Sequence, residues 1–199
     1  MTAGTERKLT IDDIADLRAY ERERPEFRAR VIELKKRRRV GVGPFVTLLF
    51  ENRDTIRFQI QEMARVERIL TDEGIQTELD VYNPLIPGPG ALSATLFVEL
   101  TSKEELVEWL PKLVGIERAV EVRIGDDVVR ATPDPSHERQ LTREAITASV
   151  HYVRFDLTPE QVEAFGREPV QVAMAHENYS YATPLDEATV AELRTDLEA

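Results

Sequence analysis

The sequence of 199 residues contains no cysteine. Disulfides, thiolate zinc sites, iron–sulfur clusters held by the protein and cysteine nucleophiles are therefore excluded. The chain also has no run of the roughly 18 apolar residues that a membrane-spanning helix needs, which excludes such a helix. Its N-terminus lacks the apolar core and cleavage site of a signal peptide, so we expect a cytoplasmic protein.

Sequence motifs that identify a reaction are lacking as well. The segment GVGPFV at 41–46 has two glycines spaced as in a dinucleotide-binding loop, but Val46 occupies the third glycine position. There is no nucleophile elbow and no Walker lysine loop. The three histidines, His137, His151 and His176, are scattered without metal-ligand spacing. The sequence therefore predicts no metal site and no cofactor.

Charge, unlike cysteine, is abundant and unevenly distributed. The 37 acidic and 26 basic side chains give a net charge of −11. Residues 1–70 carry 16 basic and 12 acidic side chains, a net charge of +4, whereas residues 71–199 carry 10 and 25, a net charge of −15. This division suits electrostatic association with another protein. The acidic bulk of the chain argues against nucleic-acid binding because it repels phosphate groups.

Much of the positive charge lies in one run of five basic residues, Lys35, Lys36, Arg37, Arg38 and Arg39. Such a run can form a surface that docks a protein or a phosphate group. It can equally mark the C-terminus of a helix, where cations meet the carbonyl end of the helix dipole. Two glycines follow shortly afterwards, as at a helix stop. We favour helix termination and keep the five residues as a candidate docking surface for a protein.

The pattern of elements predicts an α+β fold. Helices are expected at 10–23, 25–39, 52–72, 75–82 and 103–113, after Thr158, and from Pro184 to about Leu197. Strands are expected at 45–51, 91–101, 119–125, 128–132, 148–157 and 169–176. The strand–helix–strand units indicate a mixed or antiparallel sheet similar to a ferredoxin-like layer, with N-terminal helices added.

The length and composition indicate a single domain over residues 1–199, since 42% of the residues are hydrophobic and 32% are charged. Its N-terminal helical part would cover about 10–40 and its sheet part about 45–199. The polar stretch at 133–144, which holds His137, is expected to be loosely ordered and that histidine solvated.

Polar residues interrupt the apolar face of the helix predicted after Asn52. The apolar stripe is formed by Ile56, Ile60, Met63, Ala64, Val66 and Leu70. Gln59 and Glu67 fall inside this stripe, whereas Arg57 and Gln61 fall on the opposite, wetter face. A lone buried carboxylate costs several kcal/mol, so we expect Glu67 either to pair with an arginine or to line a pocket. The pairing is the favoured interpretation.

The pocket interpretation gathers five residues. Glu51, Arg57, Gln59, Glu67 and His151 are its candidates, with Glu51 contributed by the end of the preceding strand. His151 shares a strand face with two apolar neighbours, so its side chain is expected to point toward the core.

Several longer segments carry a family resemblance. AYERERPEFRARVIELKKRRRVGVGP, LLFENRDTIRFQIQEM, YNPLIP and SVHYVRF together resemble a bacterial family of unknown function, over nearly the whole chain. The resemblance implies genes placed beside those of rubrerythrin-like and heterodisulfide-reductase-like redox proteins. It implies no activity, ligand or catalytic residue.

Two functions follow as hypotheses. The first is an accessory or docking protein for a cytoplasmic redox partner. The second is an enzyme or small-molecule-binding protein that uses a polar pocket around Glu51, Gln59 and Glu67. We favour the first, because the sequence shows no motif for a nucleophile, a metal or a cofactor.

Overall fold

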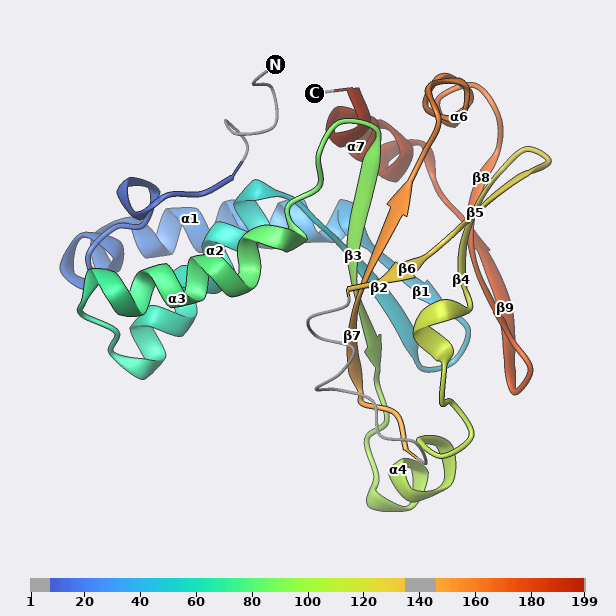
Figure 1. Cartoon of the computed structure of the whole chain (residues 1–199), viewed down its shortest axis with the longest axis horizontal. Coiled ribbons are helices and arrows are strands. Elements are labelled where there is room, and N and C mark those ends of the chain that lie inside the picture. Colours follow the sequence, from blue (N-terminus) through green and yellow to red (C-terminus); the bar gives the residue numbers. More distant parts are fainter. Residues whose placement is uncertain (1–7, 135–145, 199) are drawn as a thin grey trace.

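Two antiparallel sheets and a lobe of helices make up the computed structural model, which describes residues 8–134 and 146–198 (Figure 1). The first sheet has the strand order β1-β2-β3-β7-β6 and consists of β1 (Arg39–Val42), β2 (Val46–Glu51), β3 (Ala91–Val98), β7 (Val150–Asp156) and β6 (Thr132–Pro133). The second has the order β5-β4-β8-β9 and consists of β5 (Asp127–Arg130), β4 (Val120–Ile124), β8 (Val170–His176) and β9 (Tyr179–Pro184). All pairings between these strands are antiparallel.

The main hydrophobic core lies between the two sheets. Alternate side chains of β2, such as Leu48 and Phe50, belong to this core together with Val122 and Val172 of the second sheet. At one side, β5 continues almost directly into β6, so one stretch of chain joins both sheets. At the other side, Tyr179 closes the gap to the β1–β2 hairpin. Its hydroxyl donates to the carbonyl of Val42 at 2.8 Å and accepts the N–H groups of the next turn.

Three helices form a lobe that extends away from the sheets (Figure 1). They are α1 (Leu17–Arg38), α2 (Arg53–Glu67) and α3 (Asp72–Tyr82), preceded by the 3-10 turn η1 (Ile11–Asp13) and followed by η2 (Asn83–Leu85). The other described helices are α4 (Lys103–Trp109), η3 (Ile116–Arg118), α6 (Pro159–Phe165) and α7 (Glu187–Glu198). Across residues 8–134 and 146–198, no helix combines the length and the apolar character required to span a bilayer.

Glu62 of α2 holds the lobe together. Its carboxylate accepts hydrogen bonds from Nε of Arg24 and from the hydroxyl of the buried Tyr20, both at 2.7 Å and both on α1. Nη2 of Arg24 donates a third bond at 3.1 Å, and Arg65 donates a fourth at 3.4 Å. The hydrogen bonds from Arg24 above all lower the pKa of Glu62 to about 2, so this carboxylate is ionised at neutral pH.

The predicted α+β class and several predicted helix starts are confirmed. Asn52 caps α2 by accepting the N–H of Thr55, and Ser102 caps α4 in the same way. Thr158 caps α6, with a proline at the first helical position. The sheet part differs from the expectation in one respect. The strands joined through α4, and those joined through α6, lie in different sheets rather than in one.

Other element boundaries were predicted incorrectly. In place of the helices expected at 10–23 and 25–39 there is the 3-10 turn η1 and the single helix α1, which begins at Leu17 and has Pro25 in its interior. Tyr20 and Phe27 are buried on either side of this proline, and the helix continues past the residue that lacks an N–H donor. The short edge strands β1 and β9 were not predicted. The C-terminal helix begins at Glu187, after Asp186 has capped it by accepting the N–H of Thr189. Most of the stretch expected to be loosely ordered, including His137, lies outside the described residues.

The C-terminal end of α1 is fixed by a buried cation. The side chain of Arg38 is fully buried, and its guanidinium donates two bonds to Asp196 of α7, at 2.7 and 3.0 Å. A third bond reaches Glu192 at 3.1 Å. Because α1 ends at Arg38, the basic run does terminate a helix, as predicted.

We predict that Arg38→Ala destabilises the protein by about 3–5 kcal/mol, since it removes the buried cation that bonds both Asp196 and Glu192. Arg37→Ala is the matched control. Arg37 bonds the same Glu192 at 3.1 Å but is half exposed, so its loss should cost about 1 kcal/mol or less. Urea unfolding at neutral pH measures both changes. Equal losses for the two variants would contradict the central role of Arg38.

Candidate functional site

Glu51, the last residue of β2, lies on the face of the first sheet that is turned toward the helices. Its side chain is buried, with 2% of its surface exposed. One carboxylate oxygen accepts the hydroxyl of Thr95 on β3 at 2.6 Å, and the other accepts that of Thr55 on α2 at 2.5 Å. Each oxygen therefore has a donor, which is the condition under which a buried carboxylate is tolerated.

Three further polar side chains surround this carboxylate. Tyr152 lies opposite Thr95 in the β3–β7 pairing, and its pKa is raised by burial and by the nearby Tyr82 and Glu51, while a hydrogen bond with Gln59 works against this rise. Burial lowers the pKa of Lys35, and the attraction of Glu51 opposes this effect. We call Glu51, Thr55, Gln59, Thr95, Tyr152 and Lys35 the buried polar cluster, although only Glu51, Thr55 and Thr95 are fully buried and the other three are half-buried.

The buried polar cluster joins β2, β3, β7, α1 and α2. None of its residues lines the groove at the second sheet or the pits at the helices. The hydroxyl donors hold the carboxylate in place, so the geometry supports a structural role for Glu51 at the junction of lobe and sheet.

We predict that Thr95→Val destabilises the protein by about 1.5–3 kcal/mol, because it removes a hydrogen bond to a buried charged group. Thr47→Val serves as the control. Thr47 is also a buried strand residue that donates to a carboxylate, that of Glu99 at 2.8 Å, but Glu99 is half exposed and can be solvated instead. The control should lose about 1 kcal/mol or less. Thermal or urea unfolding compares the two, and a smaller loss for Thr95→Val would refute the assignment.

The remaining candidates for the pocket lie elsewhere. Arg57 donates to the carbonyl of Asp13 and to Glu23, each at 2.8 Å, and stacks over the ring of Phe27. His151 lies next to Tyr152 in β7 and therefore points to the opposite face, into the core between the sheets, as predicted.

The predicted burial of Glu67 is wrong. Glu67 is exposed, because the end of α2 extends beyond the elements that cover its middle. Gln61, assigned to the wetter face, is instead buried. Its side chain accepts the N–H of Ala15 at 2.8 Å and donates to the carbonyl of the same residue at 3.1 Å, so the chain between η1 and α1 covers this face of α2. Of the five candidates, the structure brings together Glu51 and Gln59.

The sequence did not predict that His151 and Glu117 form a buried polar pair. Nε2 of His151 lies 2.9 Å from both the hydroxyl of Thr147 and the carbonyl of Ala148, and Nδ1 lies 3.9 Å from a carboxylate oxygen of the buried Glu117. Glu117 is on η3, and no pattern in the sequence indicated that it would be buried. Among residues 8–134 and 146–198, no group of three or more acidic or histidine side chains is arranged to hold a metal ion.

The basic run does not form one outward surface. Arg38 is buried and is therefore withdrawn from the candidate docking residues. Lys35 belongs to the buried polar cluster, and Arg37 bonds Glu192. Lys36 pairs with Glu33 on α1, while Arg39, on β1, lies over the ring of Phe97 and 3.4 Å from Glu99.

An apolar surface lies instead at the far end of the helical lobe. Val66 and Leu70, the last residues of the predicted stripe, are 67% and 74% exposed. Leu70 lines a pit of about 110 Å³ together with Ile11, Ile14, Leu17, Ala64, Ile69 and Ile75, with Gln61 and other residues. Val66 does not line the pit, because it follows Ala64 by two residues and so lies on another side of α2. We call Leu70 and this pit the lobe-end surface. An exposed apolar side chain beside an apolar pit is typical of an interaction site.

The backbone at this surface is held in an uncommon conformation. Arg68, which ends α2, has φ of 56° and lies in the left-handed region, the one residue other than glycine in the described chain to do so. Such a conformation costs about 1–3 kcal/mol and persists where the surroundings impose it. Here it allows Ile69 N–H to bond the carbonyl of Ala64, so that Ile69 packs in the pit while Leu70 projects outward.

The lobe-end surface has an acidic border. Five exposed acids, Asp12, Asp16, Glu67, Asp72 and Glu73, lie on the segments that form it, against one exposed base, Arg68. Partial burial, together with the neighbouring carboxylate of Glu67, raises the pKa of Glu78 above its usual value of 4.5. Like charges are therefore crowded on this side of the lobe.

We predict that Glu78→Gln raises the unfolding free energy at pH 7 by about 0.2–1 kcal/mol, the range for exposed charge pairs. Because the pKa of Glu78 is raised in the folded state, this residue weakens the fold as pH increases through that pKa. The gain should thus disappear near pH 4. Glu67→Gln should give part of the same gain, and the double variant less than the sum, as a double-mutant cycle will show. Strict additivity would mean that the two carboxylates do not interact.

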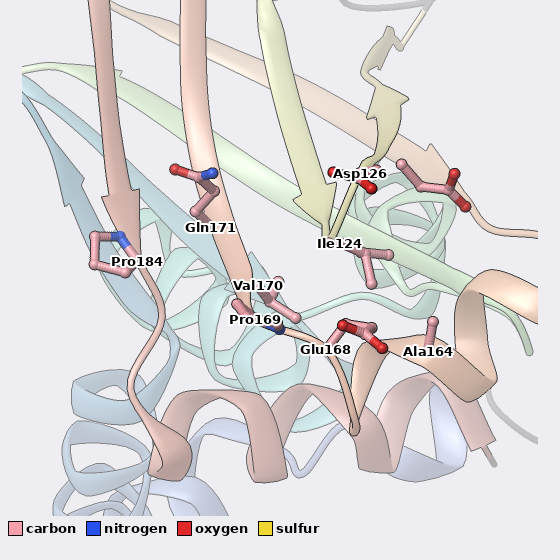
Figure 2. A pocket seen from close by; sticks show the side chains of 10 residues that line it. Ile124, Asp126, Ala164, Glu168, Pro169, Val170, Gln171 and Pro184 are labelled. Carbon is pink, nitrogen blue, oxygen red and sulfur yellow. The ribbon is translucent and has the colours of Figure 1, made fainter.

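A wider cleft lies at the second sheet, away from the predicted pocket. It is an open groove of about 730 Å³ between the β4–β5 turn, the α6–β8 connection and the end of β9 (Figure 2). Ile124 and Val170 form its apolar floor, and the exposed carboxylates of Asp126, Asp127 and Glu168 lie at its margin. The volume falls within the range of ligand-binding clefts, about 300–1,000 Å³.

The chain is thus an α+β protein with a helical lobe and two antiparallel sheets. It carries an apolar surface at the lobe end and a groove with an acidic margin at the second sheet. The chain is a member of the family described as protein of unknown function (DUF3501), which matches residues 8–197. It is similar to a crystal structure from Burkholderia pseudomallei K96243, described as a novel protein of unknown function. The two chains are 38% identical, with a TM-score of 0.88, over 96% of this chain and 100% of the other. A comparison with curated proteins gave no match.

Proposed function

We propose that this protein is an accessory protein that docks onto a protein partner through the lobe-end surface. The observation that carries the proposal is the exposure of Leu70 at an apolar pit that it lines. A large aliphatic side chain left in water loses the free energy that burial would provide, about 25 cal/mol for each Å² covered. A partner that covers Leu70 and fills the pit recovers this free energy.

The proposal also includes the nature and place of the partner. The resemblance to a bacterial family encoded beside rubrerythrin-like and heterodisulfide-reductase-like proteins supports a redox protein of the bacterial cytoplasm. The chain has no cysteine, so it supplies no thiolate to such a partner's chemistry. Its role is then to position or recruit the redox protein.

We predict that Leu70→Asp weakens binding to such a partner at least tenfold, about 1.4 kcal/mol, because it places a charge in the apolar contact. The variant should fold normally, since 74% of the Leu70 side chain is exposed. Calorimetric titration with the purified rubrerythrin-like and heterodisulfide-reductase-like proteins tests this directly. The control is Val107→Asp, which places the same charge at a valine of similar exposure, 69%, on α4.

Absence of binding to either protein would refute the redox partner. Binding that survives Leu70→Asp, or that Val107→Asp weakens equally, would refute the lobe-end surface as its site.

Small-molecule binding is the second candidate. The open groove of Figure 2 favours it more than the buried polar cluster does, because the groove is accessible and its margin carries three carboxylates suited to a cationic ligand. Polyamines such as spermidine are suitable probes. A rise in Tm that is lost in Glu168→Gln would support this function, and no rise at millimolar spermidine would remove it.

A further inference from the structure

We infer that the lobe-end surface receives an amphipathic helix whose polar side carries lysine or arginine side chains. This inference rests on the proposed docking function and adds the chemistry of the docked segment. Three features of the surface lead to it: the size of the pit, the kind of backbone around it, and the sign of its border.

The size of the pit fits a side chain better than a free ligand. Clefts that enclose small molecules measure about 300–1,000 Å³, whereas this pit measures about 110 Å³. Its lining is mostly aliphatic, with Ile14, Ile69 and Ile75 among its residues. An aliphatic side chain inserted there would also bring its neighbours onto Leu70, which lines the pit and is 74% exposed.

The backbone around the pit favours a helix over an extended peptide. A docked strand gains affinity from main-chain hydrogen bonds to an exposed sheet edge. The lobe-end surface is built from η1, the end of α2 and the start of α3, whose backbone groups are largely bonded within their own turns and helices. It offers apolar side chains instead, which match the apolar face that a helix presents at positions i, i+3 and i+4.

The border of the surface selects a basic partner. Asp16 and Asp72 line the pit itself, and Glu67 is the last residue of α2. The pKa of Glu78 is raised in part by Glu67, so carboxylates here repel one another. A cation placed between these carboxylates would relieve that repulsion, whereas an acidic segment would add to it.

The test uses two fluorescein-labelled 18-residue peptides with the same leucine face, one with lysine and one with glutamate on the polar face. Fluorescence anisotropy with the full chain should show that the lysine peptide binds at least tenfold more tightly than the glutamate peptide. Leu70→Asp should weaken the lysine peptide at least tenfold. Val107→Asp adds the same negative charge and should leave it unchanged, which separates docking from general attraction to an acidic protein.

A charge-reversal variant tests the border separately. Glu67→Lys combined with Glu73→Lys should reduce the preference for the lysine peptide at least tenfold while leaving Tm close to that of the parent chain, since both residues are exposed. Equal binding of both peptides, an unchanged preference in the reversed variant, or equal losses for Leu70→Asp and Val107→Asp would overturn the inference. The inference would also be overturned if the parent chain formed concentration-dependent dimers and Leu70→Asp dissociated them, because the occupant of the surface would then be a second copy of this chain.

The two proposals can fail independently. A redox partner that binds in a manner dependent on Leu70, without a preference for the lysine peptide, would leave the docking function standing and remove the basic helix. A preference for the lysine peptide without binding of the redox proteins would do the reverse.

Discussion

The guanidinium of Arg38 has no access to water, and its charge is balanced by carboxylates of α7 on the far side of the chain. Removing an arginine from water is expensive, and the cost is offset here by a bidentate bond to Asp196 and a further bond to Glu192. These bonds fix α1 against α7, and with them the position of the lobe relative to the sheets. β1 follows Arg38 immediately, so the same contact also sets where the first sheet begins.

The local features of this fold could be predicted from sequence, and the non-local ones could not. Caps at Asn52, Ser102 and Thr158 act within one helical turn, so the residues that form them are visible in the sequence. β1 and β9 depend on contacts between segments distant in the chain, and their few residues carry no distinct period. The basic run illustrates both cases. Its role at a helix end could be predicted from the sequence, but the burial of Arg38 depends on contacts with α7, which is distant in the chain.

The candidate site shows the same limit at the level of single side chains. The helical wheel of α2 correctly gave two faces, yet it could not tell which part of each face would be covered. Gln61 is covered by the chain that leads into α1, whereas Glu67 lies beyond that cover. Glu67, the polar residue inside the predicted apolar stripe, is therefore on the surface. Val66 and Leu70, the apolar residues near it in the sequence, are the ones whose exposure is unusual. Glu51 was rightly singled out, but its donors Thr55 and Thr95 come from an adjoining helix and a neighbouring strand.

The closure of the two sheets by Tyr179 has a consequence for how the chain is made. The hydroxyl of Tyr179 bonds Val42, 137 residues earlier, and Thr183 bonds the carbonyl of Gly41, 142 residues earlier. A ribosome adds about 5–20 residues per second, so β1 emerges on the order of ten seconds before its late neighbour. During that interval β1 has a partner in β2 on one side and an open edge on the other. Such an edge can pair with other chains, and the nascent protein is therefore exposed to aggregation until β9 has emerged.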